Sequence, residues 1–241
     1  MKKAHDLIID LGNSRVKYYL VDLPGFDLYL SVDDLPNDSS YDTYIISSVP
    51  SQTQLIVDEF KAKRELASLE IFDPQKQSSL TNLYPGFGAD RVAKLIGALD
   101  LNPGSNIILM DFGTATTIGV ANANREFLGG FISLGLRASM KALSEDCDAL
   151  DDFFKDLRNL LGEPDMKTNN TRDAIVHGAY TAHLGLINEW IFRARKLINN
   201  DQPTLTICTG GGASSFLNYF DKHIEDGELL GAFVEGLKSH H

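Results

Sequence analysis

The sequence contains only two cysteines, Cys147 and Cys208, among its 241 residues. Neither has the spacing of a metal ligand, either to the other cysteine or to a pair of histidines, so no zinc site is indicated. Such sparse cysteine usage is typical of proteins that work in a reducing compartment. We therefore expect a cytoplasmic protein.

Basic charge is also scarce. The chain has 22 Lys and Arg against 33 Asp and Glu, which gives a formal net charge of -11 at pH 7. Non-specific binding to a phosphate backbone needs clustered Lys and Arg, and here the basic residues are scattered, so we expect no nucleic-acid partner. Small anionic ligands are still allowed, because a local site is enough for them.

Long apolar runs are missing as well. No segment approaches the length of a membrane span, so we expect no membrane partner. Lys2 and Lys3 precede an apolar run, but Asp10 interrupts it, and we expect no signal peptide. A hydrophobic fraction of 43% over 241 residues is enough for one large globular domain or two smaller ones.

The stretch from Ile107 to Val120 carries the clearest chemical pattern. An apolar run ends at Asp111, Gly113 follows, and small or hydroxyl residues lead into a second apolar run. This pattern predicts a β-hairpin whose bend brings backbone N–H groups and Thr hydroxyls close to a phosphate, with a carboxylate beside its cation. The alternative is an ordinary hairpin with a glycine turn.

The same pattern occurs near the N-terminus, from Leu7 to Lys17. Aligning Asp10 with Asp111 superposes three apolar residues, the Asp, one apolar residue, the Gly and a polar residue. Two copies about a hundred residues apart predict two similar halves that could close on one polyphosphate.

Periodicity and turn residues predict the remaining elements. Strands are expected at 16–21, 27–31, 43–49, 69–72, 126–132 and 204–208. Helices are expected at 51–65, 88–101, 137–143, 171–198, 213–220 and 229–237. Ser51 and Thr171 are the expected N-caps of their helices. The Pro-Gly stop after Asn102 divides the chain into an N-terminal half, 1–103, and a C-terminal half, 104–241.

The long helix from Thr171 has a stripe of small residues at Ala174, Gly178 and Gly185. Such a stripe allows close approach of another helix, either within the chain or across a homodimer. His177 and His183 on this helix are six residues apart, which does not favour a shared metal site. The acidic run from Glu145 to Asp152 is expected to be a solvated surface.

A series of motifs extends over nearly the whole chain in a fixed order. They are Asp10-x-Gly-Asn-Ser-x-x-Lys17, Gly88-Ala-Asp-Arg91, Asp111-x-Gly-Thr-Ala-Thr116, Gly129-Gly-x-Ile-x-x-Gly135, Asn170-Thr171 and Thr209-Gly-Gly211. In this order they resemble the type III pantothenate kinases.

The resemblance implies an α/β fold of the acetate and sugar kinase, Hsp70 and actin superfamily. Two ribonuclease H-like halves, with mixed sheets flanked by helices, would hold the nucleotide in the cleft between them. It implies transfer of the γ-phosphate of ATP to pantothenate, which gives 4'-phosphopantothenate in the first step of coenzyme A synthesis. It also implies a homodimer that uses Mg²⁺ and a monovalent cation, K⁺ or NH₄⁺.

The resemblance further implies roles for individual residues. The ATP-binding residues are Asp10, Gly12, Asn13, Ser14, Lys17, Gly113, Thr114, Thr116, Gly210 and Gly211. Asp10 is expected to hold Mg²⁺ directly or through water, and Lys17 to neutralise phosphate charge. Asp111 is the expected ligand of the monovalent cation.

Asp90 takes the position of the general base, at a helix N-terminus where the dipole favours negative charge. The substrate-binding residues are Tyr84, Gly88, Ala89, Asp90, Arg91 and Thr171, with Asn82 beside Tyr84 in an Asn-x-Tyr pair. Arg91 can clamp a carboxylate with two parallel hydrogen bonds, and Thr171 is expected to reach the pocket of a neighbouring subunit.

The chain departs from the family pattern at two places. The segment from Leu83 to Gly88 is shorter than usual, which leaves the direction of Tyr84 open, and Leu134 stands where Pro is usual. Two other functions also remain open at this stage: a sugar or N-acetylhexosamine kinase of the same superfamily, and an accessory protein that binds nucleotide without turnover.

Overall fold

The computed structural model describes residues 4–22, 25–36, 40–146 and 166–239. The chain forms two compact units. Unit 1 comprises Met1–Ser105, Ala123–Phe127 and Glu225–His241, and unit 2 comprises Asn106–Asn122 and Leu128–Ile224. The first division falls close to the expected boundary after residue 103, but the segment from Glu225 returns to unit 1.

Unit 1 is built on a five-stranded mixed sheet in the order β3-β2-β1-β4-β5. Its strands are β1 (Ala4–Leu11), β2 (Val16–Asp22), β3 (Gly25–Tyr29), β4 (Ser40–Ser47) and β5 (Leu66–Ile71). β1 is antiparallel to β2 and parallel to β4, so the ends of β1 and β4 that carry Asp10 and Ser47 lie at one edge of the sheet.

Helix α1 (Pro50–Lys63) connects the parallel strands β4 and β5, which confirms the expected β-α-β unit. Its apolar face, including Ile56, Val57 and Phe60, is buried against the sheet. The expected N-cap was wrong: Val49 is the N-cap and no side chain caps the helix. Proline suits the first helical position because its missing N–H needs no partner there.

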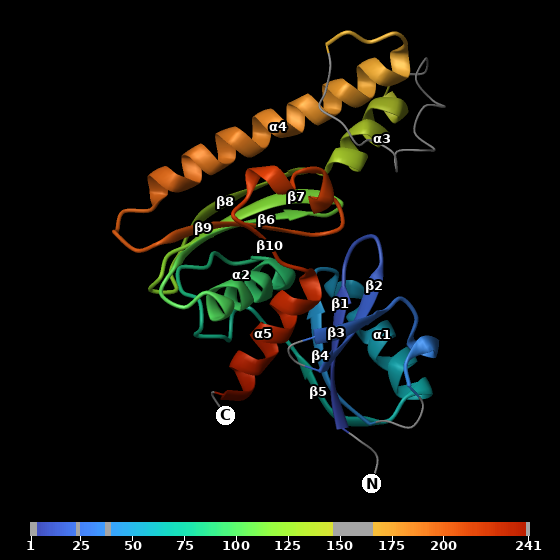
Figure 1. Ribbon diagram of the computed structural model, residues 1–241. Helices are drawn as coiled ribbons and strands as arrows, with labels where there is room; N and C mark the ends of the chain where they lie inside the picture. Colours follow the sequence, from blue (N-terminus) through green and yellow to red (C-terminus); the bar gives the residue numbers. More distant parts are fainter. Residues whose placement is uncertain (1–3, 23–24, 37–39, 147–165, 240–241) are drawn as a thin grey trace. The chain divides into compact units, whose positions relative to one another are not determined.

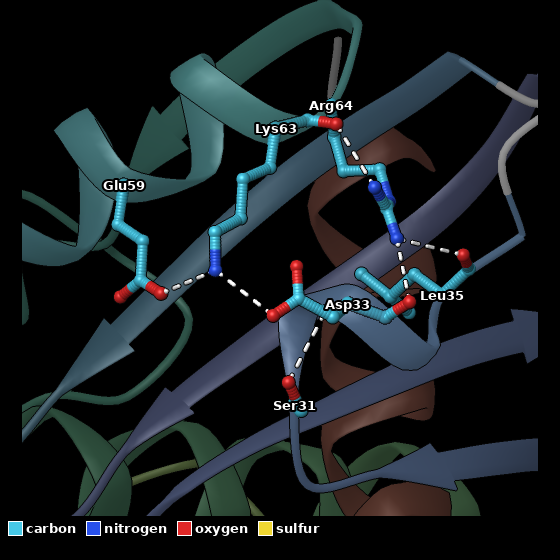
Figure 2. Close-up of polar contacts among 6 residues, drawn as sticks. All are labelled: Ser31, Asp33, Leu35, Glu59, Lys63 and Arg64. Atoms are coloured by element: carbon cyan, nitrogen blue, oxygen red, sulfur yellow. Dashed lines mark hydrogen bonds and ion pairs between the residues drawn. The ribbon is translucent and has the colours of Figure 1, made fainter.

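Polar contacts join the end of α1 to the loop after β3 (Figure 2). Lys63 Nζ lies 3.0 Å from both Glu59 Oε1 and Asp33 Oδ2. Arg64 donates from Nη2 to the backbone carbonyls of Asp33 and Leu35, at 2.9 and 3.0 Å. Exposed ion pairs contribute little stability, but the hydrogen bonds from Arg64 satisfy two backbone carbonyls of the loop after β3.

Unit 2 repeats the same sheet. Its strands are β6 (Asn106–Phe112), β7 (Ala115–Ala121), β8 (Phe127–Leu134), β9 (Thr204–Thr209) and β10 (Lys222–His223). Written from the other side, their order is β8-β7-β6-β9-β10, which matches the order in unit 1 strand for strand. β6 is likewise antiparallel to β7 and parallel to β9. The duplication predicted from the two hairpins is therefore confirmed.

In the described part of the chain, helices α3 (Leu136–Asp146) and α4 (Thr171–Leu197) follow β8. The long helix α4 runs along one face of the second sheet (Figure 1), where Ile187 and Ala194 pack into the core. Its N-cap is Asn170, whose side chain accepts a hydrogen bond from the backbone N–H of Asp173. The expectation that Thr171 caps the helix was therefore wrong by one residue.

The expected helix at 213–220 was also wrong. This segment forms two short 3₁₀ helices, Ala213–Ser215 and Leu217–Tyr219. Phe216 lies between them and is buried, with its ring stacked on those of Phe112 and Tyr180. The packing of Phe216 sets the local conformation. Sequence periodicity, on which the expected helix rested, does not reveal such packing.

Helices α2 (Ala89–Leu101) and α5 (Asp226–Ser239) pack closely within unit 1. At Gly97 a Cβ atom would lie only 1.9 Å from the backbone oxygen of Leu229, so only glycine allows this crossing. This packing is why the segment after residue 224 belongs to unit 1. Among the described residues, no helix is both long and apolar enough to span a membrane.

Candidate functional site

The first hairpin places Asp10 directly opposite Lys17 in the register of β1 and β2. Lys17 Nζ lies 3.8 Å from Asp10 Oδ2, and the Asp10 side chain is almost fully buried. The bend between the strands carries Gly12, half-buried, and Asn13 and Ser14, both exposed. The predicted phosphate motif thus combines a buried carboxylate and a lysine with an accessible backbone turn.

A second carboxylate, Asp226, lies in the same cluster. It begins α5, and its oxygens each meet one lysine: Oδ2 is 2.6 Å from Lys17 Nζ, and Oδ1 is 2.7 Å from Lys94 Nζ. Sequence reasoning missed both Asp226 and Lys94. A lysine at position 94, on the otherwise apolar face of α2, was the available signal, because a buried lysine requires a charged partner.

The pKa values of Asp10 and Asp226 are shifted in opposite directions. Burial raises the pKa of Asp10 to about 6 from its ordinary value of 3.8, although Lys94 and Lys17 act in the opposite direction. Asp226 and Asp90 add to the upward shift through their negative charges. Burial would also raise the pKa of Asp226, but the charges and hydrogen bonds of Lys94 and Lys17 hold that pKa below its usual range.

The raised pKa of Asp10 predicts a pH-dependent stability of the ligand-free protein. Between about pH 4 and pH 6 the unfolded chain releases the Asp10 proton while the folded protein keeps it, so stability falls as pH rises through this window. Replacing Asp10 with Asn removes that loss and should stabilise the protein by about 3 kcal/mol at pH 7, given the shift from 3.8 to about 6.

This prediction can be checked by denaturant unfolding of both proteins at several pH values from 4 to 7. The difference in unfolding free energy should grow across the window. A difference that does not vary with pH would contradict it.

Asp90 and Arg91 lie in the first turn of α2, which begins after the N-cap Gly88. The two side chains are half-buried, and Ala89 before them is buried. A Cβ atom at Gly88 would lie 2.8 Å from Asp90 Oδ1, so the glycine leaves room for the carboxylate to fold back over the helix N-terminus. The negative charge of Asp90 is one of the causes that raise the pKa of Asp10.

Arg91 is held by two aromatic residues. Its Nη1 donates to the hydroxyl of Tyr84 at 3.0 Å, and its Cζ lies 4.3 Å from the centre of the Phe87 ring. The Tyr84 side chain is 48% exposed, whereas Phe87 is buried. The direction of Tyr84, which the short segment left open, is thus toward Arg91. A guanidinium fixed in this way keeps donors for a carboxylate.

Hydrogen bonds of Arg125 hold the segment that carries Tyr84 in place. The backbone N–H of Thr81 donates to the Arg125 carbonyl at 2.9 Å, and Arg125 Nε donates to the Ser79 carbonyl at 2.6 Å. Arg125 Nη1 also lies 2.8 Å from Asp100 Oδ1 on α2. The loop and the helix that carry the predicted substrate residues are therefore joined through one side chain, which sequence reasoning did not identify.

The second hairpin has its bend at Gly113 and Thr114, both exposed. Asp111, near the end of β6, and Thr117, near the start of β7, are register partners close to the bend. The hydroxyl of Thr116 is buried and has no hydrogen-bond partner within the described residues. An unsatisfied buried hydroxyl is costly, and a bound ligand would satisfy it.

Two glycines from other segments, Gly210 and Gly135, pack closely against this second hairpin. A Cβ atom at Gly210 would lie 2.3 Å from Asp111 Oδ1, and one at Gly135 would lie 2.3 Å from the Gly113 carbonyl. Gly210 also has a φ of +88°, which favours glycine. Gly211 is exposed and has open space around it. The turn after β9 thus adjoins the second hairpin.

The predicted site residues do not all share one unit. Asp10, Lys17, Asp90, Arg91 and Tyr84 lie in unit 1. Five of the others, Asp111, Gly113, Thr116, Gly210 and Gly211, lie in unit 2. Thr171, the sixth predicted substrate residue, is also in unit 2, exposed at the start of α4.

The two histidines of α4 and the acidic run remain to be placed. His183 is buried, its Nδ1 lies 3.2 Å from the Ala179 carbonyl, and burial lowers its pKa. Within residues 4–22, 25–36, 40–146 and 166–239 no cluster of three or more His, Cys, Asp or Glu is suited to a metal. Of the acidic run, Glu145 is paired with Lys141 on the surface, and positions 147–152 lie outside the described residues.

The residues present fit the two expected cations. Mg²⁺ in phosphoryl-transfer sites is held by one or two carboxylates together with substrate phosphates, so Asp10 alone suits it. Asp111 supplies a carboxylate oxygen for a monovalent cation beside the bend of the hairpin, where a Cβ atom at Gly113 would lie 3.8 Å from its Oδ1.

The fold is that of the actin-like ATPases. A solved Baf family protein from Campylobacter jejuni has a TM-score of 0.62 at 20% identity, covering 97% of this chain and 98% of that one. The Alp12 filament protein has a TM-score of 0.54 at 9% identity, covering 100% of both chains. The ParM protein of psk41 has a TM-score of 0.50 at 12% identity, covering 98% of both.

The chain belongs to the type III pantothenate kinase family, whose model matches residues 27–193. A type III pantothenate kinase from Elusimicrobium minutum is 33% identical over 146 residues, or 60% of this chain and 55% of the relative. One from Francisella tularensis subsp. holarctica is 37% identical over 142 residues, 58% and 53%. The chain thus spans about half the length of these relatives. A third, from Colwellia psychrerythraea, is 28% identical over 215 residues, 83% of each.

Proposed function

We propose that this chain transfers the γ-phosphoryl group of ATP to the terminal hydroxyl of pantothenate, the first step of coenzyme A synthesis. The observation that carries the proposal is the pair Asp90 and Arg91 at the start of α2, in the same unit as the buried Asp10, in a member of the type III pantothenate kinase family. A base, a carboxylate clamp and a phosphate motif are the groups that this reaction requires.

In this mechanism Asp90 accepts the proton of the pantothenate hydroxyl as its oxygen bonds to the γ-phosphorus. The bond between that phosphorus and the bridging oxygen breaks, and ADP leaves. Arg91 binds the pantothenate carboxylate with the donors that Tyr84 does not use. Gly88 and Ala89 keep the backbone of the helix start close to the substrate.

The phosphates of ATP are bound by the two hairpins. In unit 1 Lys17 neutralises phosphate charge, and the bend of Gly12, Asn13 and Ser14 offers its polar groups. In unit 2 the corresponding groups are those of Gly113, Thr114 and Thr116, with Gly210 and Gly211 at the neighbouring turn. Asp10 would hold Mg²⁺, which supplies charge neutralisation on the phosphates, and Asp111 would hold K⁺ or NH₄⁺.

A homodimer is part of the proposal. The small residues of α4 are exposed, and Gly178 and Gly185 have open space around them, so the described part of the chain does not use the stripe for internal packing. We infer that a second copy packs there and that Thr171 acts in its pocket. Light scattering should give twice the mass of one chain, and a monomeric mass would contradict this.

The proposal is tested by ADP release on addition of pantothenate with ATP, Mg²⁺ and K⁺ or NH₄⁺. Glucose and N-acetylglucosamine serve as alternative acceptors. Pantothenate-dependent ADP release is expected, with phosphorylated product detected by mass spectrometry. Well-folded protein that releases no ADP with pantothenate, or that prefers a sugar, would overturn the proposal.

The contact between Phe87 and Arg91 gives a further prediction. Replacing Phe87 with Leu removes the ring under the guanidinium and should raise KM for pantothenate about fivefold, because a cation–π contact is lost. KM for ATP should not change. Steady-state kinetics with each substrate varied separately would show the difference.

The matched control is Phe127→Leu. The Phe127 ring packs edge-on against Phe87 at 4.7 Å between centres, whereas the Arg91 guanidinium lies over the Phe87 ring. An equal rise in KM for pantothenate in both variants would mean that general packing of the cluster, and not support of Arg91, is responsible.

A further inference from the structure

Lys17 belongs to the first phosphate motif, but its shortest ion-pair contact is with a residue outside that motif. Lys17 Nζ lies 2.6 Å from Asp226 Oδ2 but 3.8 Å from Asp10 Oδ2. Asp226 is 209 residues away in the sequence and belongs to a different element, α5. The direction of the lysine is therefore set from outside the hairpin that carries it.

Asp226 itself is held in one orientation. Its other oxygen, Oδ1, meets Lys94 Nζ at 2.7 Å, and the side chains of Asp226 and Lys94 are only 8% and 6% exposed. Each carboxylate oxygen thus has its own cation, and the carboxylate cannot rotate without breaking a buried ion pair. Losing such a pair is costly, because it leaves an uncompensated charge in the interior.

The backbone around Asp226 is fixed just as closely. A Cβ atom at Gly227 would lie 2.5 Å from the Phe26 ring of β3, and one at Gly97 would lie 1.9 Å from the Leu229 carbonyl. Because these two glycines lack side chains, the first turn of α5 packs closely against β3 on one side and against α2 on the other. Asp226 is placed by packing and not by a flexible loop.

This arrangement has two effects on Lys17. An ammonium group has three donors, so one bond to Asp226 leaves two donors with a defined direction on an otherwise flexible side chain. Lys94 also balances charge: Asp10 and Asp226 carry two formal negative charges, and the two lysines carry two positive ones. Without Lys94 the cluster would be negative, and it would repel a phosphate.

We propose that Asp226 is a positioning residue that directs Lys17 toward the phosphates of ATP, and that Lys94 holds Asp226 in place. The proposal rests on the proposed function, since it assumes that the first hairpin binds ATP. It adds a residue of the last helix to the ATP site.

The test is a double-mutant cycle read by calorimetric titration of ATP with Mg²⁺ into the full chain. Asp226→Asn should weaken ATP binding about tenfold, the loss typical of one charge-assisted hydrogen bond. Lys17→Ala should weaken it at least as much. The double variant should be no weaker than Lys17→Ala, because Asp226 acts only through Lys17. Unchanged ATP affinity in Asp226→Asn, or losses that multiply in the double variant, would overturn the proposal.

A matched control separates positioning from loosening of the helix. Lys238 ties the other end of α5 to Asp6 of β1 by an ion pair, so Lys238→Met weakens the attachment of α5 without touching Lys17. It should leave ATP affinity unchanged, and an equal loss would overturn the proposal. If Asp226→Asn does not fold, Asp226→Glu takes its place: it keeps the charge but moves the oxygens, and should still weaken ATP binding several-fold.

The two proposals fail in different ways. Protein that binds ATP but does not phosphorylate pantothenate overturns the proposed function. The double-mutant cycle of ATP affinity can still be measured on that protein and still tests the role of Asp226. Protein that phosphorylates pantothenate but shows no effect of Asp226→Asn on ATP affinity overturns only the role of Asp226.

Discussion

Replacing Asp90 with Asn is expected to lower kcat by about 10²- to 10⁴-fold, the range for loss of a general base. Asn is nearly the same size as Asp, so the first turn of α2 and the cavity left by Gly88 should be retained. The amide cannot accept the hydroxyl proton at the moment of transfer. Binding of ATP should change little, because Lys17 and the hairpin bends are untouched.

The measurement is initial-rate ADP release at saturating ATP and pantothenate, with folding verified by circular dichroism. Asp58→Asn is the matched control, since it makes the same change on the exposed face of another helix of unit 1, α1, where Asp58 accepts a hydrogen bond from Gln54. Asp90→Asn with full activity would show that Asp90 is not the base. A comparable loss in Asp58→Asn would show that the effect does not depend on the position of the carboxylate.

Replacing Gly97 with Ala is expected to destabilise the protein by about 3 kcal/mol, the upper part of the range for overpacking. The new methyl group would lie 1.9 Å from the backbone oxygen of Leu229 and 2.8 Å from its carbonyl carbon. A backbone group cannot move aside as a side-chain end can. Helices α2 and α5 would have to separate, and ATP affinity should fall together with stability because Asp226 moves with α5.

Denaturant unfolding gives the free-energy change, with Gly236→Ala as the control. Gly236 lies on α5, and a Cβ atom there would lie 2.8 Å from Asp100 Oδ2, the end of a side chain that can move aside, so alanine there should cost less than about 1 kcal/mol. An unchanged unfolding midpoint in Gly97→Ala would contradict the close crossing of the two helices.

The parts of the fold that were predictable from sequence are those with local signals. Each hairpin carries its own apolar, acidic and glycine pattern, so its strands and its bend could be located without knowledge of the rest. Helix α2 was also predictable at both ends, because Gly88 precedes its apolar periodicity and Asn102-Pro103-Gly104 stops it. The β-α-β unit around α1 followed from its flanking strands.

The parts that were not predictable depend on residues distant in sequence. Asp226 lies in a Gly-containing segment that has no motif, and only the packing of α5 on α2 brings it to Lys17. Lys94 is a single basic residue among the apolar residues of α2, and no local pattern pairs it with Asp226. The segment at 213–220 has helical composition, but the burial of Phe216 decides its conformation. Arg125 acts through its backbone and side chain together, with a φ of +63°, which no local pattern reveals.

The return of α5 to unit 1 has a consequence for the order in which the protein folds during translation. Unit 2 lies between the two main parts of unit 1 in the chain, so the ribosome releases it before α5. Unit 1 therefore stays incomplete, with Lys94 and Lys17 lacking Asp226, until after unit 2 has emerged. Domains generally fold as they emerge, but here the N-terminal unit is expected to be finished last, and a released chain that ends at residue 224 should be protected from proteases in unit 2 and not in unit 1.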